Sequence, residues 1–345
     1  MSRKKDELRW TPEGEAALAQ AARGYFPVVE ARGAPLAAIV ATKCAVYAKR
    51  VARAVAKSKG DALTAKTAKL LAAWTPKTKP TVESAALIAT ALGACAEDAD
   101  IAPFLAYILE TRGAAFSVAV LVAMWRVASN HHESSGVSLR AAQLDTTSAH
   151  DASVSYGKGD IVQFLRDAGR RDPQLRAQLA AAVDAVYPDA PLAAKAPLAC
   201  AIDDAARAAA LAKELLKQTA IYPHWSWHSL PQIVTDVALA KKLYKKLELR
   251  PWIADFGRLG VRALELYAQA FDGTLDGATR ERMLVELANV HGPRTARIMA
   301  AQVTNRRHAA TTKSYLVKYP ELLADVLADP ACADDHPYLE PLVAT

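Results

Sequence analysis

Apolar residues recur at helical spacing along most of this chain, in short runs separated by glycine, proline or polar residues. The clearest series lies between Asp255 and Asp329, where five short helices are predicted in succession. They are predicted to begin with the segments 256–264, 277–284, 293–298 and 306–310, and directly after Tyr319-Pro320. Helices this short cannot each enclose a core, so they must stack on one another. The pattern predicts an all-α array of antiparallel helix hairpins, an α-solenoid.

Helices are also predicted upstream of this series, each bounded by a start or stop signal. Thr11 can cap a helix that begins at Pro12 and ends near Arg23, because threonine suits the cap and proline suits the first helical position. Further helices are predicted over residues 34–58, 62–74, 82–93, 102–111, 114–128, 173–186, 197–216 and 230–247. No alternating run is long enough to predict a convincing strand.

Helical spacing lapses between Ser129 and Asp160, where polar and turn-forming residues dominate. A loop this long is uncommon inside a compact domain, and it is either functional or mobile. We therefore predict basic helical repeats over 1–128, a polar loop or insertion over 129–160, and HEAT-like helical repeats over 161–345. The loop collects residues that can ligate a metal or transfer protons, although polar loops hold such residues for solvation alone: His131, His132, Glu133, Asp145, His150 and Asp151.

Composition agrees with an all-helical chain of close-packed helices. Alanine occurs 75 times in 345 residues, and alanine both favours helix and lets helices approach closely. The four cysteines lie far apart, which predicts buried thiols in a reducing compartment. The charged N-terminus predicts no secretory signal. The most apolar run, 114–125, is too short to cross a bilayer. We expect a cytoplasmic protein without membrane association.

Positive charge is concentrated at one end of the chain, where residues 1–80 hold 16 Lys/Arg against 6 Asp/Glu. One helical stripe and the helix after it supply the candidate polyanion-binding side chains: Lys43, Lys49, Arg50, Arg53, Lys57, Lys66 and Lys69. Such a stripe can neutralise the phosphates of a nucleic-acid backbone. It can equally meet an acidic protein, or it can be a solvated face that keeps an alanine-rich helix soluble.

A second candidate site is the aromatic segment 222–228, in which His224 and His228 are spaced as two metal ligands on a helix face. The residue after His224 is Trp225 and not the glutamate of zinc proteases. Two nearby prolines, Pro223 and Pro231, leave little room for a regular helix. A packed aromatic turn is the alternative, so we predict no metal and no cofactor.

The segment from about 250 to 330 resembles the helical-repeat region of bacterial MolR-like proteins, which often carry a Trp-Gly-Arg domain. The resemblance rests on four short motifs, at residues 296–300, 305–307, 314–316 and 319–323, and on the preceding run 256–264. It implies HEAT-like hairpins in a right-handed superhelical array, and it carries over no catalytic residue. No Trp-Gly-Arg triplet occurs in this chain.

We therefore expect a non-enzymatic HEAT-like scaffold that binds another macromolecule, most simply a protein, on a curved surface. The alternative is binding of a DNA or RNA backbone through the basic N-terminal helices, with or without DNA-repair-type chemistry. Nucleic-acid binding predicts that the basic side chains converge on the concave groove, whereas a merely solvated face predicts that they are dispersed on the convex side.

Overall fold

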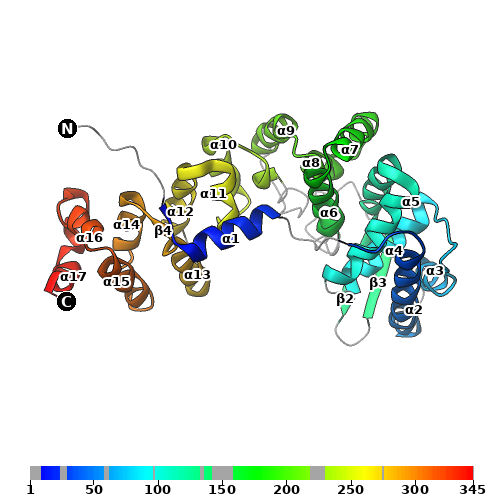
Figure 1. The fold of residues 1–345 in the computed structure, drawn as a ribbon, viewed down its shortest axis with the longest axis horizontal. Helices are drawn as coiled ribbons and strands as arrows, with labels where there is room; N and C mark the ends of the chain where they lie inside the picture. The colour runs from blue at the N-terminus through cyan, green and yellow to red at the C-terminus, as the bar shows by residue number, and fades with distance from the viewer. Residues whose placement is uncertain are drawn as a thin grey trace. The chain divides into compact units, whose positions relative to one another are not determined.

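The chain forms two compact units in the computed structural model (Figure 1). Unit 1 combines residues 1–23 with residues 235–345, and unit 2 comprises residues 24–234. The structure describes residues 9–23, 29–57, 62–95, 98–132, 136–141, 158–217, 230–273 and 276–344. The predicted loop region 129–160 falls inside unit 2, and the predicted division into two sets of repeats with an inserted loop stays a prediction.

Unit 2 is built from helices that pair with their neighbours in the chain, together with one β-hairpin. Its helices are α2 (Gly33–Lys57), α3 (Ala62–Ala72), α4 (Val82–Cys95), α5 (Asp98–Met124), α6 (Lys158–Arg171), α7 (Pro173–Val186), α8 (Leu192–Ala201) and α9 (Ala205–Lys217). Contacts are most extensive between α2 and α3 and between α4 and α5. Helix α7 contacts both α5 and α6, and α8 contacts both α6 and α9. The predominance of helix confirms the predicted all-α class, whereas the superhelical arrangement of the helices stays a prediction.

The β-hairpin corrects two expectations from the sequence. Strands β2 (Val127–His132) and β3 (Gly136–Ala141) pair antiparallel, with Ser129 opposite Leu139. The helix predicted to end at Ala128 therefore ends earlier, and part of the predicted loop 129–160 is strand. Packing against α2, α3 and α4 stabilises the hairpin. Such contacts between distant residues leave no pattern in the sequence around the two strands. Residues 133–135 and 142–157 of the predicted loop lie outside the described residues.

The single helix predicted over 197–216 is also wrong, because Asp203 adopts φ 54° and separates α8 from α9. Helix α5 is kinked at Gly113, whose φ of 78° and ψ of −177° are not helical. Within α5, the stretch Ile101–Met124 is long and apolar enough to cross a membrane by length and composition, with half of its most apolar window buried. A buried core helix passes the same test, so the absence of membrane association stays a prediction.

Unit 1 consists of short helices and a two-stranded ladder. Its elements are β1 (Arg9–Trp10), α1 (Pro12–Arg23), α10 (Val237–Lys246), α11 (Ala254–Leu259), α12 (Leu264–Phe271), α13 (Gly277–Leu287), β4 (Val290–His291), α14 (Pro293–Ala300), α15 (Ala309–Lys318), α16 (Pro320–Leu327) and α17 (His336–Leu339). Short 3₁₀ turns span Gly260–Ala263, Pro330–Asp335 and Glu340–Ala344. The short helices predicted around 277, 293 and 306 and after Tyr319-Pro320 are confirmed as separate elements. The one predicted to open with 256–264 is wrong, because α11 ends at Leu259, Gly260 adopts φ 57°, and α12 begins at Leu264.

The even-numbered helices of unit 1, from α10 to α16, form a row in which each contacts the next even-numbered one. Contacts join α10 to α12, α12 to α14, and α14 to α16, while α13 and α15 contact each other alongside (Figure 1). Side-chain caps set where several of these helices begin. Asp236 accepts a hydrogen bond from the Leu239 N–H, and Asp276 accepts one from the Thr279 N–H. Such caps satisfy amide groups that the helix itself leaves unpaired.

The N-terminal segment belongs to unit 1 because it pairs with residues near position 290. In the β1–β4 ladder, Arg9 lies opposite His291 and Trp10 opposite Val290. Helix α1 packs against α11, and Trp10 meets Phe256 edge to face with ring centroids 5.0 Å apart. The predicted cap of α1 is confirmed, since the Gly14 N–H donates to Thr11 Oγ1 at 3.1 Å.

Candidate binding groove between α12 and α14

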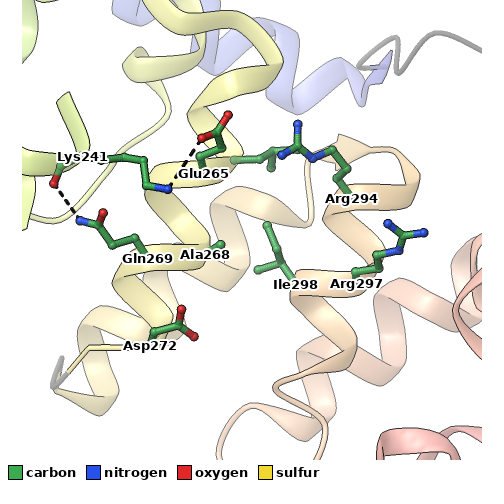
Figure 2. Close-up of a pocket in the computed structure, with 9 residues that line it drawn as sticks. Lys241, Glu265, Ala268, Gln269, Asp272, Arg294, Arg297 and Ile298 are labelled. Atoms are coloured by element: carbon green, nitrogen blue, oxygen red, sulfur yellow. Dashed lines mark hydrogen bonds and ion pairs between the residues drawn. The ribbon is translucent and has the colours of Figure 1, made fainter. Parts of the chain in front are cut away.

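An open groove of about 530 Å³ lies where α10, α12 and α14 of unit 1 come together (Figure 2). It is lined by residues of these three helices and by Asp272, which directly follows α12: Lys241, Leu264, Glu265, Ala268, Gln269, Asp272, Arg294, Arg297 and Ile298. The volume is within the usual range for small-molecule pockets, roughly 300–1,000 Å³, and it is enough for a few side chains of a bound segment. We call it the α12–α14 groove.

Aliphatic side chains form the apolar part of the groove. Figure 2 shows Ile298 pointing from α14 toward Ala268 on α12. Leu264 also lines the groove and is almost fully buried, whereas Ala268 and Ile298 are half-buried. An aliphatic group of a ligand placed here would cover the exposed parts of these two side chains, which favours binding in proportion to the apolar area removed from water.

The side of the groove formed by α10 and α12 carries charges and an amide that hold one another in place. Lys241 Nζ lies 3.7 Å from Glu265 Oε2. The side-chain amide of Gln269 donates to the Lys241 carbonyl oxygen at 2.9 Å, which ties α12 to α10 (Figure 2). Asp272 is exposed at the end of this side. Acceptors and a donor therefore face a ligand from this side.

The α14 side presents two arginines in different situations. Arg297 is paired with Asp329, with 2.6 Å between Nε and Oδ2. Arg294 is half-buried and makes no hydrogen bond or ion pair with another residue that the structure describes. Figure 2 shows Arg294 reaching from α14 toward the α12 side of the groove. Its guanidinium offers a planar set of donors suited to a carboxylate.

The sequence places these groups on one face of α14 through ordinary helical spacing. Residues i, i+3 and i+4 share a face, and here these are Arg294, Arg297 and Ile298. The opposite face supplies the core with Thr295, Ala296 and Met299. Pro293 suits the first position of this helix, and burial of the opposite face determines which residues point into the groove.

The basic side chains predicted from the sequence lie on unit 2, on the paired helices α2 and α3. Lys49, Arg50 and Arg53 are exposed on α2, and Lys43 is half-buried there; Lys69 is exposed on α3. Lys66 forms an ion pair with Glu83, with 2.6 Å between Nζ and Oε1, so part of its charge is already compensated. Lys57 ends α2, but its side chain lies outside the described residues.

The predicted histidine pair, His224 and His228, lies outside the described residues, so this prediction stays open. Among the described residues, no three His, Cys, Asp or Glu side chains gather as a metal site would require. Burial raises the pKa of the Cys44 thiol to about 12 and that of Cys200 to about 11. Both thiols are therefore protonated near neutral pH and are poor nucleophiles.

A buried charged cluster in unit 1 serves packing, because its own members satisfy one another. In unit 1, the Asp255 carboxylate accepts hydrogen bonds from the Tyr244 hydroxyl at 2.8 Å and from the Trp252 N–H at 3.0 Å, and it also pairs with Arg258. Burial raises the pKa of Tyr244 above its ordinary value, and the neighbouring Asp255 charge adds to this shift. Both groups are buried and neither lines the groove.

Sequence reasoning did not identify the α12–α14 groove. Its charged residues are ordinary helix-surface types that lie up to 56 positions apart, from Lys241 to Arg297. The local signal is the helical spacing of residues 293–298, which by itself indicates packing and not a binding site. No protein-family model, curated protein or solved structure matches the chain.

Proposed function

We propose that this chain is a non-enzymatic helical-repeat scaffold, and that its α12–α14 groove binds a segment of a protein partner. The observation that carries the proposal is the mixed character of the groove: three cations, two carboxylates, an amide and exposed aliphatic carbon in one open depression. A polypeptide segment can satisfy all of these groups, because it presents donors, acceptors and apolar side chains together.

A nucleic-acid backbone fits the α12–α14 groove less well than a polypeptide does. Phosphate binding depends on a surplus of cations that displaces counterions from the nucleic acid. In the groove, Glu265 and Asp272 oppose a phosphate, and Lys241 and Arg297 already have acidic partners. A carboxylate side chain that reaches Arg294, next to an aliphatic side chain placed on Ile298, matches the groove better.

The arrangement of unit 1 supports a repeat scaffold as the framework. Contacts pass from α10 to α12, α14 and α16 in turn, so each helix shields its neighbours as in a solenoid. We propose that these helices follow the right-handed superhelical path implied by HEAT-like repeats. Repeat arrays of this kind bind their partners on extended surfaces, and we place the binding segment in the α12–α14 groove.

Nucleic-acid binding by α2 and α3 is the second candidate function. The exposure of Lys49, Arg50, Arg53 and Lys69 supports it. If these cations contact phosphates, affinity for labelled DNA or RNA falls steeply with salt, and reversing the charge of Lys49, Arg50 and Arg53 abolishes it. Unchanged mobility of both nucleic acids at low salt would discard this candidate.

Selection of peptides from a random library displayed on phage tests the groove proposal. The immobilised full chain should enrich sequences that combine a carboxylate with an aliphatic residue. An enriched peptide should bind the Arg294→Glu/Ile298→Ala variant at least about tenfold more weakly than it binds the original chain, because an ion pair and an apolar contact are lost.

The matched control is Arg306→Glu/Val317→Ala, which changes the same residue classes at exposed positions of unit 1 that do not line the groove. This variant should retain the affinity of the original chain. Equal loss in both variants, or in neither, would refute the groove as the binding site.

A further inference from the structure

Helix α2 presents a second surface, on unit 2, that the groove proposal does not use. Ile39 and Val46 are exposed there, at 38% and 47% of their full accessible area. They alternate with basic residues along one side of the helix: Ile39, Lys43, Val46, Arg50 and Arg53. We call this set the aliphatic–basic stripe.

The spacing within the aliphatic–basic stripe is that of a helix-pairing seam. Its members are separated by four, three, four and three residues, which is the 3.5-residue repeat that keeps a seam facing a partner helix. The stripe extends over about 21 Å at 1.5 Å per residue. That length accommodates roughly four turns of a second helix.

The stripe is not part of the core of unit 2. A different side of α2 supplies that core with Leu36, Val40, Cys44 and Val51, each at 0–1% exposure. Thr42 and Ala38 are the small exposed residues that flank the stripe, with exposed Lys49 between them around the helix. Small side chains at a contact let two helices approach closely.

Charge decides which kind of helix fits this surface. Residues 33–57 contain no aspartate or glutamate, so the stripe and its flank repel a basic partner and attract an acidic one. The aliphatic members argue against nucleic acid, because Ile39 and Val46 gain nothing from a phosphate backbone and occupy positions that cations would need. An amphipathic helix covers them with its own apolar residues.

We infer that α2 is a docking face for an amphipathic helix with acidic flanks, contributed by a protein partner. The inference goes beyond the groove proposal, since it concerns the other unit and other chemistry. Its chemistry combines burial of Ile39 and Val46 with ion pairs to Lys43, Arg50 and Arg53.

The test uses a labelled synthetic helical peptide of about three heptads with Leu at the seam positions and Glu at the flanks. Fluorescence anisotropy with the full chain should show binding, and a peptide with Lys in place of Glu should not bind. Ile39→Ser/Val46→Ser should weaken binding about tenfold, and so should Arg50→Glu/Arg53→Glu.

The Lys69→Glu/Val285→Ser variant is the control, because it changes one exposed cation and one exposed aliphatic residue outside the stripe. It should bind the Glu peptide normally, and so should the groove variant Arg294→Glu/Ile298→Ala, which separates this test from that of the groove. Single-stranded and duplex DNA are measured in parallel.

The inference is overturned if the Glu peptide fails to bind. It is also overturned if Ile39→Ser/Val46→Ser leaves binding intact while Arg50→Glu/Arg53→Glu abolishes binding of peptide and DNA alike. That second result would identify α2 as a general polyanion surface.

Discussion

Asp203 joins separate segments of unit 2 through its carboxylate. It accepts from Arg166 Nε at 2.5 Å and from Arg170 Nε at 2.7 Å, and both arginines lie on α6. Arg166 also donates to the Gln232 carbonyl oxygen at 3.1 Å. The left-handed φ of 54° at Asp203 costs free energy that these contacts offset. Asp203 therefore accounts for the break between α8 and α9, and its carboxylate attaches α6 to the segment at that break.

We predict that Asp203→Asn lowers the free energy of unfolding by about 3 kcal/mol at pH 7, because Arg166 then stays buried without its counter-charge. Asparagine tolerates the left-handed conformation, so the change isolates the charge. Urea denaturation measures the effect. Asp184→Asn is the control; it alters an exposed pair with Arg207, and about 0.5 kcal/mol or less is expected.

The effect of Asp203→Asn should also depend on pH. Burial raises the pKa of Asp203, but hydrogen bonds and charges from Arg170 and Arg166 outweigh it and leave the pKa below its ordinary value. A carboxyl with a lowered folded-state pKa stabilises the fold above about pH 4 and loses this contribution as pH falls through the lowered pKa. The difference between the two proteins should therefore shrink in acid; a constant difference would contradict the assignment.

At the scale of elements, Thr64 fastens α3 to the β-hairpin. The Leu139 N–H donates to Thr64 Oγ1 at 2.8 Å, and Thr64 Oγ1 donates to the Leu139 carbonyl oxygen at 3.2 Å. The side chain is fully buried. A helix residue thus pairs with backbone groups of β3, which would otherwise be buried without partners at a cost in stability.

We predict that Thr64→Val costs about 1–3 kcal/mol, because it leaves two buried backbone groups of Leu139 unpaired at similar side-chain volume. Thr67→Val provides the matched control on the same helix. Thr67 is equally buried, but its hydroxyl donates only to the Leu63 carbonyl oxygen of its own helix, so the loss should be smaller. Equal losses in chemical denaturation would show that Thr64 does not fasten the hairpin.

The elements that could be predicted from the sequence are those with local signals. Helix α7 spans Pro173–Val186 as expected, because Asp172 caps it and Pro173 opens it. The failures depend on distant contacts. The 202–204 break is stabilised by arginines of α6, and β3 is paired with Thr64. The groove depends on α10, α12 and α14 meeting, which no local spacing encodes.

At the scale of the whole molecule, the division into two units predicts two unfolding transitions, because each unit has its own core. The N-terminal segment should contribute to only one of them. Helix α1 approaches Asn289 so closely that a Cβ at Gly14 would lie 2.8 Å from the Asn289 carbonyl oxygen. Position 14 therefore requires glycine, because a larger side chain would clash with Asn289.

We predict that Gly14→Ala lowers the stability of the transition assigned to unit 1 by about 1–3 kcal/mol, through overpacking, and leaves the other transition unchanged. Gly257→Ala is the control, since its added Cβ meets Leu18 at an ordinary 3.6 Å. Differential scanning calorimetry separates the transitions. An equal shift of both transitions by Gly14→Ala would contradict the assignment of residues 1–23 to unit 1.

Site-specific photocrosslinking tests most directly whether the α12–α14 groove holds a protein segment. A photoreactive phenylalanine derivative replaces Gln269, which lines the groove, or Arg306, which does not. A peptide selected by the full chain is then added and irradiated. Binding in the groove predicts a covalent adduct from position 269 and none from position 306. An adduct from position 306 alone, or equal adducts from both, would contradict it.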